Sequence, residues 1–271
     1  MPHTHDVEVG QNQVRKTFVS WSLDEPEREW GALKHLSAYA PGLAPSPIAR
    51  TEVGGRPTIV MSRVPGAPLA GEITGAQTQA LARALRRLFD VPVPPGLAVR
   101  ANDPLGFSRR FKQWLAEEYD WSECQDAGLV REAVESARLW LDQHLFSEGW
   151  IVDPVIALGD GNLDNVLWDG ETCRLIDWEE YGVSDLAYEV ADIVEHASSR
   201  LENRLEADAL IEAIFLSESQ RRRVEQHRPF FAAFWLAMLL PGNAGWGRNP
   251  TGSTEDQSRH LLRLLEGSGR Q

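Results

Sequence analysis

The sequence predicts an α+β fold with two unequal lobes, a small β-rich amino-terminal lobe and a larger, mostly helical carboxy-terminal lobe. Short apolar runs separated by turn residues fill most of the first 62 residues. After residue 75, apolar positions recur mainly at helical spacing. Val64-Pro65-Gly66-Ala67-Pro68 lies between these regions and interrupts regular structure. We therefore expect an amino-terminal lobe at residues 1–62, ending in a hinge, and a helical lobe at residues 63–271.

The small lobe is expected to contain two hairpins with one helix between them. Its strands are predicted at residues 7–9, 14–18, 48–53 and 58–61, joined pairwise by turns at Gly10-Gln11-Asn12 and Gly54-Gly55. Trp30, Leu33 and Leu36 recur at helical spacing between the hairpins, and Asp24 is placed to cap that helix.

The large lobe is expected to be helical around one small sheet. Helices are predicted at residues 76–89, 107–119, 129–145, 186–204, 207–215, 217–240 and 254–265. Residues 151–177 differ, because short strands at 155–157, 166–168 and 173–176 alternate there with loops rich in glycine and aspartate. Charged or amide residues in such loops are candidates for a site.

Composition limits the classes of function. The formal net charge is −13, so the surface is expected to repel nucleic acid and anionic membranes and to favour a cationic small molecule. The longest apolar run, residues 230–240, is too short to span a bilayer, and the first ten residues show no secretory signal. The two cysteines cannot form a disulfide scaffold. We therefore expect a soluble cytoplasmic protein of unknown oligomeric state.

Three polar residues in the 151–177 stretch indicate phosphoryl transfer. Asp160 follows an apolar strand, Asn165 comes five positions later, and Asp177 ends the next strand. Phosphoryl transfer uses a carboxylate to orient the attacking hydroxyl and oxygen ligands to hold Mg²⁺ on the phosphates. Protein kinases have the same Asp-to-Asn interval and a metal-binding aspartate downstream. Asp160 is therefore the candidate catalytic residue, and Asn165 and Asp177 are the candidate metal ligands.

The surrounding residues make the resemblance specific. Gly159-Asp160 with Asn165-Val166-Leu167, followed by Leu175-Ile176-Asp177-Trp178-Glu179, resembles the signature of the aminoglycoside phosphotransferase and choline kinase superfamily. Residues 182–192 resemble the segment that packs beneath the site in these kinases, and residues 61–66 resemble their linker between lobes. The resemblance extends from about Val9 to Leu265 and is closest to the antibiotic-type phosphotransferases. It implies a protein-kinase-like fold.

The resemblance also implies roles in the small lobe. Lys16 would contact the phosphates of ATP or GTP, and Glu29 on the following helix would hold Lys16 in place. Lys34 and Glu27 are the alternatives for these two roles.

At the hinge, the resemblance implies contacts with the nucleotide base. Val60-Met61 would close the base pocket, and the backbone from Ser62 to Val64 would hydrogen-bond the base. Side-chain identity at such backbone contacts does not distinguish ATP from GTP.

Two departures from the family pattern bear on the site. Leu158 stands where the family has histidine, and its side chain cannot give the hydrogen bond that would hold Asp160. Only Gly10-Gln11-Asn12 precedes Lys16 in place of a full glycine-rich loop. His196, elsewhere in the chain, is expected to be structural.

The expected activity is transfer of the nucleotide γ-phosphate to a hydroxyl of a small acceptor. The resemblance implies an antibiotic or related natural product, with resistance as the consequence. Glu179 and Glu180 adjoin the metal strand and are candidates to contact a cationic acceptor. No room exists after Asp177 for the activation loop of protein kinases, so a protein acceptor is not expected. A metabolic kinase acting on choline, a sugar amine or a hydroxylated amino acid, and a non-catalytic pseudokinase, are the alternatives.

Overall fold

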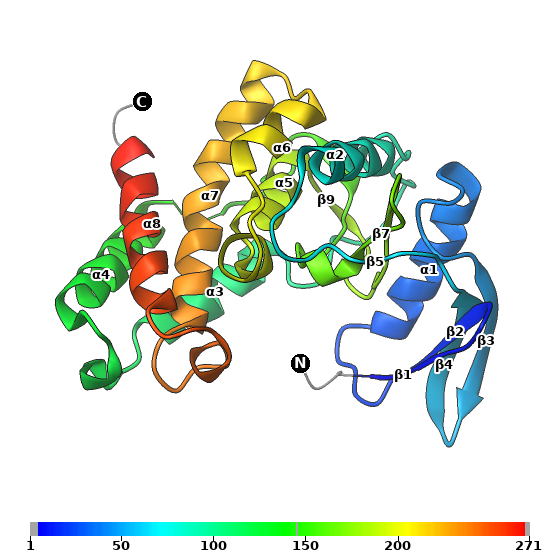
Figure 1. Cartoon of the computed structure of the whole chain (residues 1–271), viewed down its shortest axis with the longest axis horizontal. Coiled ribbons are helices and arrows are strands. Elements are labelled where there is room, and N and C mark those ends of the chain that lie inside the picture. The colour runs from blue at the N-terminus through cyan, green and yellow to red at the C-terminus, as the bar shows by residue number, and fades with distance from the viewer. Residues whose placement is uncertain (1–4, 145, 269–271) are drawn as a thin grey trace.

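The structure, a computed structural model, describes residues 5–144 and 146–268 and has the α+β fold that the sequence predicts (Figure 1). Its strands are β1 (Asp6–Val9), β2 (Gln13–Thr17), β3 (Pro47–Val53), β4 (Arg56–Ser62), β5 (Ala67–Pro68), β6 (Pro154–Ile156), β7 (Val166–Trp168), β8 (Cys173–Leu175) and β9 (Val183–Asp185). Its α-helices are α1 (Glu25–Tyr39), α2 (Gly75–Phe89), α3 (Pro104–Leu115), α4 (Ala127–Gln143), α5 (Leu186–Glu195), α6 (Ala207–Ile214), α7 (Glu218–Met238) and α8 (Ser253–Ser268).

The amino-terminal region is a four-stranded antiparallel sheet with α1 packed beside it. The strand order is β1-β2-β4-β3, and Lys16 on β2 pairs in register with Ile59 on the central strand β4. Phe18, Leu33 and Ile59 are fully buried, which fixes α1 against the sheet. Asp24 precedes α1, but its side chain makes no cap; the backbone amides before the helix are bound by the Glu25 carboxylate instead.

The chain passes from the first sheet to the second within a few residues. β4 ends at Ser62, and β5 pairs with β7 at residues 67 and 68. Between them, Gly66 has a φ of 118°, and a Cβ there would lie 2.8 Å from the backbone of Trp168. A larger residue is therefore excluded from this crossing. The lobe boundary at Ser62 stays a prediction, and residues 1–4, 145 and 269–271 of the expected ranges lie outside the described part of the chain.

Two small antiparallel sheets carry the loops of the 151–177 stretch. One has the order β5-β7-β8, and the other pairs β6 with β9. An isolated parallel bridge between Val99 and Val183 adds the segment before α3 to the edge of β9. Gly182 allows this close approach, because a Cβ there would lie 2.5 Å from the backbone nitrogen of Arg100. The bridge thereby brings Arg100 under the loop that follows β6.

Helices make up the rest of the large region. In Figure 1, α3, α4, α7 and α8 gather at the end of the molecule away from the β1–β4 sheet. Phe107 and Phe111 of α3 contact Phe230 and Phe234 of α7 edge to face, at centroid distances of 5.1–6.1 Å. No helix among the described residues is long and apolar enough to cross a bilayer.

One predicted helix is shorter than expected. The spacing predicts a helix over residues 186–204, but α5 ends at Glu195, and His196 has extended backbone angles (φ −56°, ψ 142°). Residues 198–202 then form a separate, short π-helix. The backbone amide of Ser198 donates to the ring of His196 rather than continuing the helix (3.0 Å). A local side-chain acceptor competes here with the helical hydrogen bond, which apolar spacing alone does not reveal.

Acid sensitivity of the fold is predicted from His227 on α7. This ring stacks on Phe146 (5.4 Å) and meets Tyr188 (5.9 Å), and burial lowers the pKa of His227 to about 4. Because the unfolded chain binds the proton more tightly, stability falls as pH drops from about 6.5 towards 4. Between pH 7.5 and 5 the wild type should lose about 1–2 kcal/mol more unfolding free energy than His227→Phe, measured by denaturant titration. His144→Phe, at an exposed histidine, should keep the slope of the wild type; equal slopes for all three proteins would refute the assignment.

Candidate active site

The loop after β6 is held from two sides by buried charged groups. The amides of Leu158 and Gly159 donate to Glu189 Oε2 of α5 (2.9 and 3.2 Å). The guanidinium of Arg100 donates to the Gly159 carbonyl and pairs with Glu189 (2.7 Å). Gly159 has a φ of 96°, and a Cβ there would lie 2.4 Å from that of Glu180. These contacts fix the backbone just before Asp160.

Asp160 emerges from this loop with one oxygen held and the other less restrained. Its Oδ1 accepts from the Asn162 amide (3.1 Å) and lies 3.2 Å from His196 Nε2. From the described part of the chain, its Oδ2 receives only a long contact from Asn165 Nδ2 (3.4 Å). Burial acts to raise the pKa of Asp160, but the contacts with His196, the Asn162 amide and the charge of Arg100 outweigh it and lower that pKa. The carboxylate is therefore ionised and able to accept a proton or a hydrogen bond through Oδ2.

Lys16 joins the first sheet to the strand end that carries Asp177. Its Nζ lies 2.7 Å from Glu29, 2.5 Å from Asp177 and 3.2 Å from Glu179. Burial acts to lower the pKa of Lys16, but these three carboxylates outweigh it and raise the pKa far above its usual value. The structure thus brings Lys16, Glu29 and Asp177 together. The alternative Glu27 pairs with Arg50 at the surface instead.

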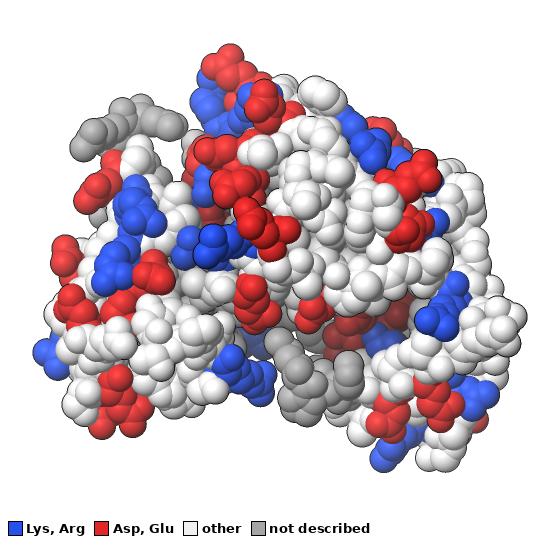
Figure 2. All heavy atoms as spheres, viewed as in Figure 1, with Lys and Arg blue, Asp and Glu red and all other residues white. Residues whose placement is uncertain are grey.

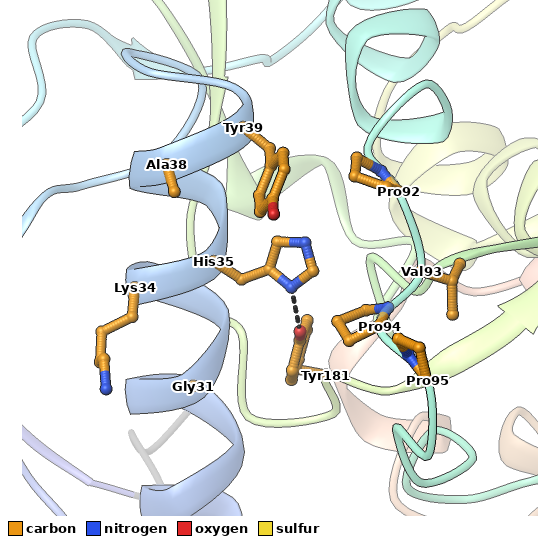
Figure 3. Close-up of a pocket in the computed structure, with 10 residues that line it drawn as sticks. All are labelled: Gly31, Lys34, His35, Ala38, Tyr39, Pro92, Val93, Pro94, Pro95 and Tyr181. Atoms are coloured by element: carbon orange, nitrogen blue, oxygen red, sulfur yellow. Dashed lines mark hydrogen bonds between the residues drawn. The ribbon is translucent and has the colours of Figure 1, made fainter.

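Helix α1 is tied to the large lobe on another of its faces. Arg28 donates to the carbonyls of Val99 (3.0 Å) and Tyr181 (2.6 Å). His35 Nδ1 is hydrogen-bonded to the Tyr181 hydroxyl (2.7 Å), at a cavity of about 500 Å³ between α1 and the proline-rich residues 92–95 (Figure 3). In Figure 3, Lys34 points away from these prolines. The helix that carries Glu29 is therefore anchored to the segment just after Asp177.

The oxygen atoms near Lys16 are suitable for a metal ion. Asn165 donates through Nδ2 to Asp160, which leaves its Oδ1 free as a ligand. The Ile176 amide donates to the Asn165 carbonyl (3.0 Å), so the Asn165 loop and the Asp177 strand end run side by side. Carboxylate oxygens of Glu29, Asp177 and Glu179 lie within 4.8 Å of one another, but the Lys16 ammonium lies among them and contacts all three. The side-chain oxygens of Asn165 and Asp177, on neighbouring segments, are of the kind that Mg²⁺ prefers.

Asp177 itself has strained backbone geometry. Its φ of 66° lies in the left-handed region, which costs energy for a residue with a Cβ. Such outliers concentrate at functional sites, where the surrounding structure enforces them.

The hinge residues differ in what they can offer. Met61 is buried at the end of β4. The Ser62 amide donates to Ser46 and the Arg63 amide to Asn12, both at 2.9 Å. The Val64 amide has no partner within residues 5–144 and 146–268, so Val64 is the hinge position whose donor is open.

The two candidate acceptor-binding carboxylates are both engaged by protein groups. Glu179 contacts Lys16 and His5 Nε2 (2.9 Å); burial opposes ionisation, but these two partners lower the pKa of Glu179 to about 2. Glu180 pairs with Arg100 (2.7 Å) and accepts from Asn102 (2.9 Å), and burial raises its pKa. A cationic acceptor would have to share these carboxylates with His5 or Arg100.

Two residues that the sequence analysis did not assign to the site contact the catalytic loop. Arg100 lies in the proline- and glycine-rich connection between α2 and α3, where no motif marks it. His196 was expected to be structural, and its ring lies 3.2 Å from the Asp160 carboxylate. Its place four residues after the segment resembling the kinase motif is a signal in the sequence that points to it.

The surface near the site carries both signs of charge. Figure 2 shows acidic and basic side chains interspersed over the visible face, with both kinds recessed in the hollow between the lobes. Within the site, Lys16 pairs with Glu29, Asp177 and Glu179, and Arg100 pairs with Glu180.

The fold and the grouped residues define a phosphotransferase of the kinase type. A model of the phosphotransferase enzyme family matches residues 9–227, most of the chain. The chain belongs to this family. No curated protein sequence matches it.

Solved structures of low sequence identity share the fold. A choline/ethanolamine kinase family protein from Mesorhizobium loti has a TM-score of 0.62 and 16% identity, with 97% of this chain and 85% of that chain covered. Choline kinase LicA from Streptococcus pneumoniae has a TM-score of 0.58 and 14% identity, covering 98% and 91%. Spectinomycin phosphotransferase APH(9)-Ia, in complex with ADP and spectinomycin, has a TM-score of 0.57 and 13% identity, covering 98% and 93%.

Removal of Arg100 should strongly destabilise the protein. Arg100 is buried and faces Glu180, Glu189 and Asp192, so Arg100→Met leaves carboxylates buried without a cation. We expect a loss of about 3–5 kcal/mol of unfolding free energy at pH 8, measured by denaturant titration. The loss should shrink at pH 5.5, because the orphaned carboxylates then take up protons.

The matched control is Arg56→Met, which breaks an exposed 3.9 Å pair with Asp6. It should cost no more than about 1 kcal/mol at either pH. A similar small cost for Arg100→Met would show that the buried cation is dispensable.

Proposed function

We propose that the protein transfers the γ-phosphate of ATP or GTP to a hydroxyl of a small molecule, with Mg²⁺. Lys16 contacts the nucleotide phosphates and is held by Glu29. Asn165 and Asp177 hold the metal, which neutralises charge on the phosphates when bound. Met61 packs against the base, and the hinge backbone at Ser62 and Val64 lies beside it.

The acceptor hydroxyl meets Asp160 in this proposal. Because Oδ1 already accepts from the Asn162 amide and contacts His196, Oδ2 is the oxygen that accepts the hydroxyl hydrogen as the oxygen attacks the γ-phosphorus. The bond from the γ-phosphorus to the bridging oxygen breaks, and the nucleoside diphosphate leaves with the negative charge. The proton passes from the hydroxyl to Asp160 and then to solvent.

One observation carries the proposal: Lys16 bridges Glu29 and Asp177, while Asn165 connects that strand end to Asp160. Residues far apart in the sequence form one continuous polar site in the order that phosphoryl transfer requires. This intact arrangement weighs against a pseudokinase. It also weighs against Lys34 as the phosphate contact.

The class of acceptor is proposed from the family resemblance rather than from contacts within the site. The resemblance to antibiotic-type phosphotransferases favours an antibiotic or related natural product with resistance as the outcome, and a choline, sugar-amine or hydroxy-amino-acid kinase is the alternative. Glu179 and Glu180 stay the candidate contacts for a cationic acceptor. Since Lys16 and Arg100 already pair with them, a polycationic acceptor gains less there than the net charge of −13 suggests.

The first test is nucleotide turnover with Mg²⁺ and ATP or GTP, over a panel of aminoglycosides, other hydroxylated antibiotics, choline and sugar amines. Phosphorylated product should appear with at least one acceptor, detected by mass spectrometry. Asp160→Asn should lower kcat at least about 100-fold, because a positioned proton acceptor is lost. Asp164→Asn, an exposed carboxylate in the same loop, should retain wild-type kcat. Equal activity of the two variants would remove Asp160 from the mechanism.

A second test separates Lys16 from its alternative. Lys16→Met should reduce kcat/KM for the nucleotide about 10- to 100-fold, the scale of a lost charge-assisted contact. Lys34→Met should leave it unchanged, since Lys34 makes no contact with the Lys16 cluster in the described residues. Calorimetric titration with the nucleotide checks that the loss includes binding, and a larger loss in Lys34→Met would reverse the assignment.

A further inference from the structure

His196 lies at the junction of three elements around the catalytic loop. Its ring is buried, with 5% of the residue exposed, and meets the Trp235 ring of α7 edge to face at 4.3 Å. The end of α5 at Glu195 turns the His196 side chain out of the helical path. Its Nε2 then lies 3.2 Å from Asp160 Oδ1.

The hydrogen bonds of the ring settle which nitrogen carries the proton. The Ser198 amide donates to His196 Nδ1 (3.0 Å), which requires Nδ1 to be unprotonated. Ser198 Oγ also lies 2.7 Å from Nδ1 and accepts from the Leu163 amide (2.9 Å), so its hydrogen is free to point at the ring. The ring proton therefore sits on Nε2, the nitrogen that lies 3.2 Å from Asp160 Oδ1.

These bonds close a ring of contacts on the catalytic loop itself. Leu163, three positions after Asp160, binds Ser198; Ser198 binds His196; and His196 binds Asp160. Asn203 fixes the turn by donating to the Ser198 carbonyl (2.8 Å) and accepting from the Gly71 amide (2.6 Å). His196 is thus connected to two positions of the catalytic loop, directly to Asp160 and through Ser198 to Leu163.

The loop offers Asp160 little other support. Leu158 is apolar and its residue is 2% exposed, packed in the core. Without His196, only the Asn162 amide would hold Oδ1, and the Asp160 side chain is 47% exposed. A half-exposed carboxylate with one donor can rotate away from the acceptor.

We infer that His196 is the positioning residue for Asp160, which locks Oδ1 so that Oδ2 faces the acceptor hydroxyl. This inference rests on the proposed phosphotransfer. His196 acts through Asp160 and touches neither nucleotide nor acceptor. Its loss therefore lowers kcat and leaves KM for the nucleotide unchanged.

The kinetic test compares two substitutions at one position. His196→Ala removes the donor and should lower kcat about 10- to 100-fold, the scale of a misplaced catalytic group, with KM for ATP or GTP within twofold of wild type. His196→Gln keeps an N–H of similar reach and should recover most of that loss. His144→Gln, at an exposed histidine, should behave as wild type. If Gln is as impaired as Ala, or if KM rises in step with the loss of kcat, the positioning role is wrong.

A second measurement does not need turnover. Long-range ¹H–¹⁵N spectra of protein labelled at histidine should show the His196 ring protonated at Nε2 only, and Asp160→Asn should shift its Nε2 resonance. A ring protonated at Nδ1, or one indifferent to Asp160→Asn, overturns the inference even in an active enzyme. If the wild type phosphorylates no acceptor, the proposed function fails, and the spectra alone then decide whether His196 holds Asp160.

Discussion

The buried ammonium of Lys16 is the contact on which the arrangement of the two lobes depends. A buried charge is tolerated only where opposite charges and hydrogen bonds compensate for lost hydration. Here the compensation comes from both sides: Glu29 belongs to α1 of the small lobe, whereas Asp177 and Glu179 belong to the large one. A displacement of one lobe against the other would leave Lys16 paired with Glu29 but would remove its contacts with Asp177 and Glu179. The same contacts therefore fix both the geometry of the site and the position of one lobe relative to the other.

A second pair of buried charges, Arg100 and Glu189, holds the backbone of the catalytic loop from beneath. Glu189 accepts two backbone amides, and Arg100 binds the carbonyl of the same loop while pairing with Glu189. The loop is thereby held through its main chain. This explains how an apolar Leu158 is compatible with an ordered Asp160. Support for the carboxylate comes from His196 instead, from another part of the chain.

The elements themselves were largely predictable because they depend on local patterns. Glycine turns between apolar runs predict the hairpins of the small lobe. Apolar residues at helical spacing predict most helices, and the helices end where this spacing ends. The helix predicted over 186–204 is interrupted at His196 and continues only as a short π-helix, since the His196 ring competes for a backbone amide at that point. That competition depends on where a side chain points, which spacing does not contain.

By itself, the sequence determined the fold class and the family. It also predicted Asp160, Asn165 and Asp177 as site residues, because these lie within one short segment whose spacing is typical of the family. It also proposed Lys16 and Glu29, which the structure places in contact. Only the tertiary structure decided that Arg100 and His196 belong to the site and that Glu179 and Glu180 are already paired with protein groups. The physical reason is that charge compensation acts through space: a buried carboxylate takes the donor that the fold brings within 3 Å or so, whatever its distance along the chain.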